Sequence, residues 1–211
     1  YGKFASNKDY IKQTTGQFYS RRFVMSYPNE QLPAGRDIKR TGVYDAQKSA
    51  GAIFGNSWGL EVPLMFGSKN FIEEPSLRRS NAFDFVKKEH LAVREEVGIL
   101  DSSGFSRFEI QGKGATQWLN QLFSTDLPNQ NKVKLAVMLG YDGRLKGDLT
   151  CFNWGEDHYW VMGSYYLREW HLRWFHDHLP GGKKVLETDG EVYLTDISDN
   201  IGGYAVSGPN A

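Results

Sequence analysis

The chain has 211 residues, and its 25 basic and 25 acidic side chains cancel to a formal net charge of +0. No net field draws it towards phosphate backbones or anionic lipids, so we expect neither nucleic acid nor a membrane as a partner. No apolar run approaches the roughly 20 residues that a membrane helix requires. The single cysteine, Cys151, cannot form an internal disulfide. It favours a reducing compartment, cytoplasm or mitochondrial matrix, although a thiol-poor exported protein also fits.

The first part of the chain, residues 1–67, is rich in glycine, proline, aromatic and basic residues and has no sustained helical or strand period. This composition predicts an irregular segment that wraps around other structure. The exception is a short helix that begins near Val43, where side chains at helical spacing line one face, and that Gly51 ends.

From Ser80 the apolar spacing becomes regular. Intervals of three and four residues predict a helix over 82–97, with a cap oxygen from Ser80 or Asn81 and Gly98 as a left-handed terminator. The predicted elements that follow are a strand in SRFEIQG (106–112) and a helix in GATQWLNQLFSTD (114–126).

The next segments predict hairpins. KLAVMLG (134–140) and LKGDLTCFNW (145–154) are joined through Asp142 and Gly143, a pair typical of hairpin turns. The remaining predicted elements are a strand over 158–164, a helix over 165–179 and short strands over 184–188, 191–197 and 204–208. Because hairpins join adjacent strands, we expect an α+β fold with a mostly antiparallel sheet and packed helices, preceded by the irregular segment.

Several common chemical motifs are absent from the sequence. Gly112 and Gly114 lack the third glycine of a dinucleotide fingerprint, and neither a Walker lysine motif nor GxSxG occurs. His176 and His178 would point about 200° apart on a helix, so we predict no metal site. We expect the histidines at the surface, and the tryptophans of the predicted helices, Trp118, Trp170 and Trp174, in the core.

Asp148 stands out because it lies in the second arm of the hairpin, among residues that favour burial. Strand alternation places it on one face with Lys146 and Thr150, which by default is a solvated face. Gly147 argues against a plain strand, since glycine inside a strand often marks the close approach of a ligand or another backbone. The pattern leaves both readings open: a surface carboxylate and a carboxylate in a ligand cleft.

Residues 83–211 resemble a known family. HLAVREEVGILDSSGFSRFEIQGKGATQWLNQLFSTDLP, MLGYDGRLKGDLT and YAVSGPNA are similar, in order, to motifs of the glycine-cleavage T-protein (aminomethyltransferase) folate-binding domain. The residues in register at the start of this match are His90, Val93, Arg94, Gly98, Asp101 and Ser103.

The stretch before it, RRFVMSYPNEQLPAGRDIKRTGVYDAQKSAGAIFGNSWGLEVPLMF, is similar to the connector of FAD-dependent dimethylglycine and sarcosine dehydrogenases. The residues that carry this similarity are Pro33, Gly35, Arg36, Tyr44, Gly51, Phe54, Gly55, Trp58, Glu61 and Pro63. The resemblance implies two parts: residues 1–67 as a connector from a flavin amine-oxidoreductase domain, and residues 68–211 as the N-terminal portion of a folate-binding domain. Since the sequence lacks an initial methionine and stops after a strand-like run, we expect it to be a piece of a longer protein.

The resemblance also implies a function. FAD, in a domain outside this sequence, would oxidise a small methylated amine, and tetrahydrofolate would capture the one-carbon unit here. Asp148 is then the catalytic residue. The implied folate-binding residues are Met138, Leu139, Tyr141, Arg144, Asp148 and Gly163. We expect partial burial to raise the pKa of Asp148 towards the working pH.

The sequence departs from the T-protein pattern at the positions of the implied site. T-proteins carry two consecutive acids, the first of them implied as catalytic, where this chain has Gly147 and Asp148. The family's pterin-binding asparagine aligns with Gly163, and a family tyrosine aligns with Leu135. Two alternatives therefore stay open: a non-catalytic scaffolding domain, and a related folate-dependent demethylase acting on a methylated sulfur compound.

Overall fold

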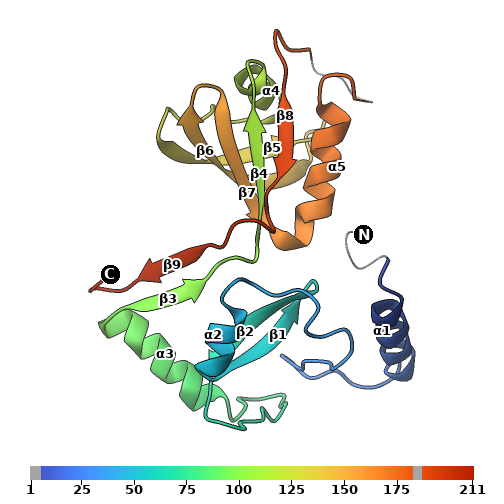
Figure 1. Ribbon diagram of the computed structural model, residues 1–211, viewed down its shortest axis with the longest axis vertical. Helices are drawn as coiled ribbons and strands as arrows, with labels where there is room; N and C mark the ends of the chain where they lie inside the picture. Colours follow the sequence, from blue (N-terminus) through green and yellow to red (C-terminus); the bar gives the residue numbers. More distant parts are fainter. Residues whose placement is uncertain (1–5, 183–186) are drawn as a thin grey trace. The chain divides into compact units, whose positions relative to one another are not determined.

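The computed structural model describes residues 6–182 and 187–211 (Figure 1). The chain divides into two compact units: unit 1 comprises residues 1–103 and 202–211, and unit 2 comprises residues 104–201. Unit 2 is therefore an insertion, because the chain leaves unit 1 after Ser103 and returns to it at Gly202.

Unit 1 contains three helices and two small antiparallel sheets among its described residues. Its helices are α1 (Lys8–Ser20), α2 (Tyr44–Ser49) and α3 (Phe83–Glu95). One sheet pairs β1 (Ala52–Ser57) with β2 (Leu60–Phe66), and the other pairs β3 (Gly98–Asp101) with β9 (Tyr204–Ser207). In the second sheet Gly98 lies opposite Ser207, so the segment after the insertion closes a sheet that began before it.

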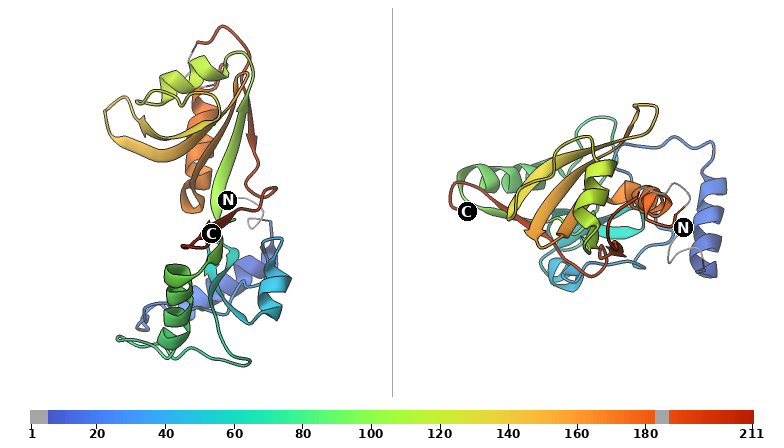
Figure 2. Two further views of the ribbon diagram at one scale, coloured as in Figure 1. Left: turned by 90° about the vertical axis from the view of Figure 1, so that its left-hand side faces the viewer. Right: turned by 90° about the horizontal axis from the view of Figure 1, so that it is seen from above.

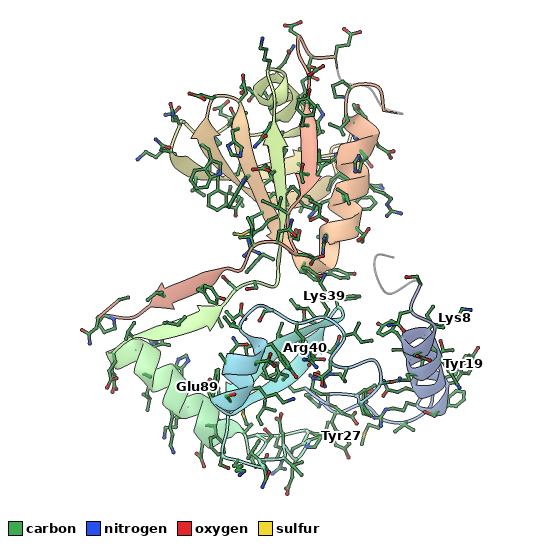
Figure 3. All side chains as sticks on the ribbon, viewed as in Figure 1. Lys8, Tyr19, Tyr27, Lys39, Arg40 and Glu89 are labelled. Carbon is green, nitrogen blue, oxygen red and sulfur yellow. The ribbon has the colours of Figure 1, made fainter. Side chains whose placement is uncertain are left out.

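The prediction of an irregular segment over 1–67 is wrong for α1 and for the β1–β2 hairpin. Asn7 caps α1 by accepting a hydrogen bond from the Tyr10 N–H at 2.9 Å. The helix, whose ends lie near the labelled Lys8 and Tyr19 in Figure 3, buries none of its residues. The hairpin turns at Trp58 and Gly59, whose φ angles are 53° and 89°. The sequence has no Asn-Gly pair there to indicate a tight turn.

The short helix after Val43 is confirmed as α2, and the helix predicted over 82–97 is confirmed as α3. The predicted role of Gly98 is wrong. Gly98 does not have a positive φ, and it is the first residue of β3. The helix ends because Glu96 leaves helical geometry at φ −133° and ψ −108°.

Unit 2 is a five-stranded antiparallel sheet with helices, in the strand order β5-β6-β7-β4-β8. Its strands are β4 (Phe105–Gln111), β5 (Lys132–Leu139), β6 (Leu145–Gly155), β7 (His158–Ser164) and β8 (Tyr193–Asp196), and its helices are α4 (Ala115–Leu122), the single 3₁₀ turn η2 (Tyr165–Leu167) and α5 (Arg168–His178). The predicted α+β class with a mostly antiparallel sheet is confirmed. Figure 2 shows that the sheet is twisted, with the β5–β6 hairpin turned away from the direction of β4. The predicted strand over 184–188 lies largely outside the described residues.

The core of unit 2 lies between one face of the sheet and the two helices. Phe108, Leu149 and Val161 from the sheet meet Trp118 of α4 and Phe175 of α5, and all five are 0% exposed. Trp118 thus confirms its predicted burial, whereas Trp170 is 37% exposed. The expectation of surface histidines is wrong for His171 and His178, which are 1% and 2% exposed on the inner side of α5.

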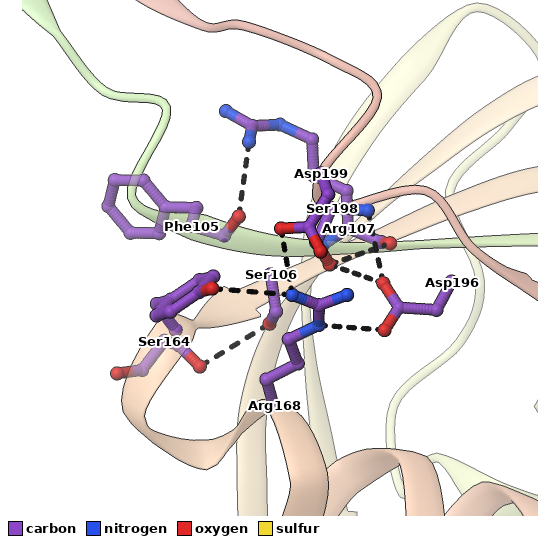
Figure 4. A network of polar contacts seen from close by, with 9 residues as sticks. Phe105, Ser106, Arg107, Ser164, Arg168, Asp196, Ser198 and Asp199 are labelled. Atoms are coloured by element: carbon purple, nitrogen blue, oxygen red, sulfur yellow. Dashed lines mark hydrogen bonds and ion pairs between the residues drawn. The ribbon is translucent and has the colours of Figure 1, made fainter. Parts of the chain in front are cut away.

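The start of α5 is fixed to the end of β8 by an ionic network (Figure 4). Arg168 donates to Asp196 at 2.7 Å and to Asp199 at 3.0 Å. Ser198 donates to Asp196 and accepts from the Arg107 N–H at 2.8 Å, which extends the network to β4. These bonds hold α5, and with it His171, in a defined place against the sheet.

Candidate functional site

The candidate site is the face of the unit 2 sheet that points away from the core. Buried side chains of both α4 and α5 belong to the core cluster on the other face. We call the outward-pointing face the open face. It carries alternate residues of neighbouring strands, and the strand register fixes which of them are neighbours.

Two rows of side chains cross the open face. In the first row Leu135 lies opposite Thr150, and Met162 lies opposite both Thr150 and Arg107. The second row comprises Val133, Phe152, Trp160, Glu109 and Thr195. Leu135 and Val133 are 58% and 55% exposed, so the open face presents more apolar surface than a purely solvated sheet face would.

Asp148 lies beside the first row, directly opposite Val137 of β5. Its neighbours along β6, Gly147 and Leu149, are buried, whereas Asp148 itself is exposed. The alternation predicted from the sequence is thus present, and the expected partial burial of Asp148 is not. Its carboxylate is directly accessible to a ligand that lies on the open face.

Gly147 and Gly163 point to the opposite side of the sheet. A Cβ atom at Gly147 would lie 2.6 Å from Nε2 of His171, and one at Gly163 would meet Leu149 and lie 3.4 Å from Nδ1 of His171. An acid at 147 would therefore project into the core. In this chain, the second position of the T-protein acid pair is the one that faces outward, and it is the one occupied by an acid.

The other predicted folate-binding residues do not gather around Asp148. Met138 is 0% exposed and pairs with Gly147, so it belongs to the core side. Leu139 is 39% exposed, next to the hairpin turn. Tyr141 is 77% exposed with its ring centroid 6.0 Å from that of His178, and the exposed Arg144 lies 3.7 Å from Asp142. The structure thus brings Asp148 together with residues that were not predicted.

The main polar cluster that the sequence analysis missed is Glu109 with its two donors. Trp160 Nε1 donates to Glu109 Oε1 at 3.1 Å, and His158 Nε2 lies 2.9 Å from the same oxygen. The Trp160 hydrogen bond lowers the pKa of Glu109, with a smaller contribution from His158. Trp154 packs edge-on against Trp160 with ring centroids 5.3 Å apart. Alternation in FSRFEIQ and HYWVMGS places these residues on one face, a signal that could have revealed the cluster.

The described parts of the chain were compared with what a metal cluster and a membrane-spanning helix require. Residues 6–182 and 187–211 contain no group of three or more His, Cys, Asp or Glu side chains that could hold a metal ion. Within the same residues, every helix is too short or too polar to cross a bilayer.

Comparison with known protein families identifies the chain. The family model described as the GCVT N-terminal domain matches residues 43–211, which is more than half of the sequence. The chain belongs to the GCVT N-terminal domain family. A second model, described as the FAD dependent oxidoreductase central domain, matches residues 1–41. The resemblance stated from the sequence motifs is thereby confirmed.

Relatives of this GCVT domain chain include enzymes of both expected kinds. Mitochondrial dimethylglycine dehydrogenase of Mus musculus is 29% identical over 214 residues, covering 100% of this chain and 24% of the mouse protein. Aminomethyltransferase of Bacillus velezensis is 29% identical over 176 residues, covering 82% of this chain and 41% of the relative. The chain thus spans a quarter to two fifths of the length of these relatives.

A solved structure shares the fold of the GCVT domain chain. The crystal structure of glycine cleavage system aminomethyltransferase T from Bartonella henselae matches with a TM-score of 0.60 and 19% sequence identity. The match covers 82% of this chain and 42% of the other.

Proposed function

We propose that the open face of unit 2 binds tetrahydrofolate and that Asp148 is the catalytic carboxylate of a folate-dependent one-carbon transfer. The transfer would be the second half of an FAD-linked N-methyl amine dehydrogenase reaction, in a longer protein whose flavin domain oxidises the amine. The observation that carries the proposal is an outward-facing carboxylate, at the T-protein acid pair, in a chain of the GCVT N-terminal domain family. The name of the mouse relative supports a mitochondrial location.

The residues around Asp148 fit a reduced pterin. A pterin is a flat ring system with several N–H donors along one edge, so it needs an apolar surface and an acceptor at its rim. Val137, Leu135 and Met162 provide apolar surface next to Asp148, and its carboxylate provides the acceptor. When bound, tetrahydrofolate supplies the amine nitrogens that take up the one-carbon unit.

Asp148 has two tasks in this proposal. As a carboxylate it accepts hydrogen bonds from the ring donors and stabilises positive charge that develops near them. As a base it holds a proton released during transfer and passes it to solvent, to which it is exposed. Thr150, the next outward residue on β6, offers a hydroxyl that can orient the ligand along the strand.

Calorimetric titration with tetrahydrofolate tests this function. We expect the chain to bind, Asp148→Asn to weaken binding at least about tenfold, since a charge-assisted hydrogen bond contributes about 1.5–3 kcal/mol, and Asp126→Asn to bind like the wild type. Asp126 is a matched control because it is an exposed aspartate of unit 2 in the loop before β5. Equal affinities of the Asp148 and Asp126 variants would contradict the assignment.

A scaffolding domain without folate is the second candidate function. It is favoured by the burial of Met138 and Gly163, two of the six predicted binding residues, on the core side of the sheet. This function predicts no heat of binding at ligand concentrations up to the solubility limit, together with unchanged thermal unfolding. A ligand-dependent rise in the unfolding midpoint would eliminate it, because a ligand stabilises the state that it binds.

A further inference from the structure

His171 is a buried titratable residue that the proposed chemistry does not use. It lies in α5, is 1% exposed, and packs against Phe175 with ring centroids 6.4 Å apart. Among the described residues, neither of its ring nitrogens has a hydrogen-bond partner of normal geometry. The backbone of Lys146 lies close enough to act on the ring, but a buried imidazole so weakly paired is unusual because unpaired polar groups are costly in a protein interior.

Two glycines of the sheet make the space for this ring. Gly147 of β6 and Gly163 of β7 both face it, and a methyl group at Gly147 would lie 2.6 Å from Nε2. The imidazole is therefore in direct contact with the strand backbone one residue before Asp148. A displacement of the ring and a displacement of this strand segment are coupled, because a close-packed interior has no free space to separate them.

We propose that His171 is a positioning residue for Asp148: its neutral imidazole supports the β6 segment at Gly147, and protonation of the ring displaces that segment and weakens ligand binding on the open face. The inference rests on the proposed function for its effect on binding, but the mechanical coupling between His171 and Asp148 does not.

The electrostatic surroundings of His171 favour the neutral ring. Burial lowers the pKa of the imidazole, while the nearby backbone of Lys146 and the carboxylate of Asp148 act in the opposite direction. On β6, the carboxylate of Asp148 acts on the ring, and the ammonium of Lys146 lies 5.5 Å from the ring centroid of Trp174. On α5, Arg168 lies three residues before His171 and is held by Asp196 and Asp199. Gly163 of β7 and Phe175 of α5 also lie against the His171 ring, and neither residue titrates.

A proton added to His171 puts a charge on a buried ring, and the opposing contributions of the Lys146 backbone and the Asp148 carboxylate do not outweigh the cost of that burial. The charged ring gains stability by moving towards solvent, and that movement disturbs Gly147, which the ring contacts. Because the pKa in the folded state lies below the ordinary value, the supporting form is complete above the ordinary histidine pKa. It is lost as the pH falls through the lowered one.

The test uses three variants of the full chain and one reduced folate, 5-formyltetrahydrofolate. His171→Phe keeps a flat ring but removes the titration. Gly147→Ala adds a methyl group against Nε2, on the side of the sheet away from the ligand. Gly42→Ala is the control, because nothing lies within 4 Å of a Cβ atom there.

We expect the dissociation constant of the wild type to rise about twofold at the pH that equals the pKa of His171, and about tenfold one unit below it, since only the competent fraction binds. In His171→Phe the dissociation constant should not show this rise at low pH. Gly147→Ala should bind the folate more weakly than Gly42→Ala even at pH 7.5. Superimposable pH profiles of the wild type and His171→Phe would overturn the proposal.

A measurement without ligand separates this inference from the proposed function. In a pH titration of the wild type by NMR, we expect the side-chain carboxyl carbon of Asp148 and the amide of Gly147 to shift with the pKa of the His171 ring. If the chain binds no folate but these signals follow His171, the function fails and the positioning role stands. If the chain binds folate but the signals ignore His171, the positioning role fails alone.

Discussion

At the scale of single residues, Arg36 and Glu61 of the expected connector form an ion pair in unit 1. Arg36 donates through Nε and Nη2 to both oxygens of Glu61, at 2.8 and 2.5 Å, and Glu61 is 1% exposed. The Asp37 N–H donates to Glu61 as well, at 2.9 Å. Burial alone would raise the pKa of Glu61, but the hydrogen bonds from Arg36 and Asp37 outweigh it, so the pKa is lowered.

Glu61→Gln should destabilise unit 1 by about 3–5 kcal/mol, because it leaves the Arg36 guanidinium without its charge partner. Urea unfolding of the full chain measures this loss, with the exposed Glu74→Gln as the control, expected within about 0.5 kcal/mol of the wild type. Since the folded pKa of Glu61 lies below its ordinary value of 4.5, the pair stabilises the fold above that pH and loses its effect as the pH falls through the lowered pKa. Equal unfolding midpoints for the Glu61 and Glu74 variants at pH 7 would contradict this account.

At the candidate site, the direction of single side chains was predictable from the sequence, but their exposure was not. The period of two in LKGDLTCFNW correctly places Asp148 outward and Leu149 inward, because that alternation follows from strand geometry. Whether an outward carboxylate is covered depends on residues distant in sequence, so its exposure could not be predicted. The inward direction of Gly163 was predictable from the alternation in HYWVMGS, in which Tyr159 and Val161 are buried.

At the scale of elements, the sequence indicated the turn between β5 and β6 but not the turn between β1 and β2. The Asp142–Gly143 pair forms the predicted turn between β5 and β6, with Gly143 at φ 74° and its N–H donating to the Gly140 carbonyl at 2.8 Å. The elements of unit 2 that the sequence revealed bury a periodic face. Helix α1 and strand β2 of unit 1 were missed, and Pro63 within β2 is a residue that weakens a strand pattern.

Gly143→Ala should destabilise the hairpin by about 1–2 kcal/mol, entirely through the left-handed backbone, because nothing lies within 4 Å of a Cβ atom there. Gly143→Asn should cost less, since asparagine tolerates this conformation. Gly16→Ala is an informative control: Gly16 lies in α1 with open space around it, so alanine should stabilise that helix. Amide hydrogen exchange along β5 and β6 measures the first two effects, and unchanged protection in Gly143→Ala would contradict the role of the turn.

At the scale of the whole molecule, family and fold divide the chain at different places. The GCVT N-terminal domain matches residues 43–211, which cover all of unit 2 and much of unit 1, and the flavoprotein domain matches residues 1–41. One family domain thus contributes to both compact units because unit 2 is inserted into unit 1. The expected division into residues 1–67 and 68–211 remains a proposal about how such a chain joins its flavin and folate parts.

The central claim is that a reduced folate lies on the open face beside Asp148 and not on the core side of the sheet. Two methionines distinguish these faces: Met162 lies in the first row of the open face, whereas Met138 is 0% exposed among the core residues. The most direct measurement is a titration of the methionine-methyl-labelled chain with 5-formyltetrahydrofolate, followed by NMR. We predict that the Met162 methyl signal shifts in proportion to binding, that the Met138 signal stays in place, and that Asp148→Asn weakens the response. A shift of Met138 with none at Met162 would contradict the account.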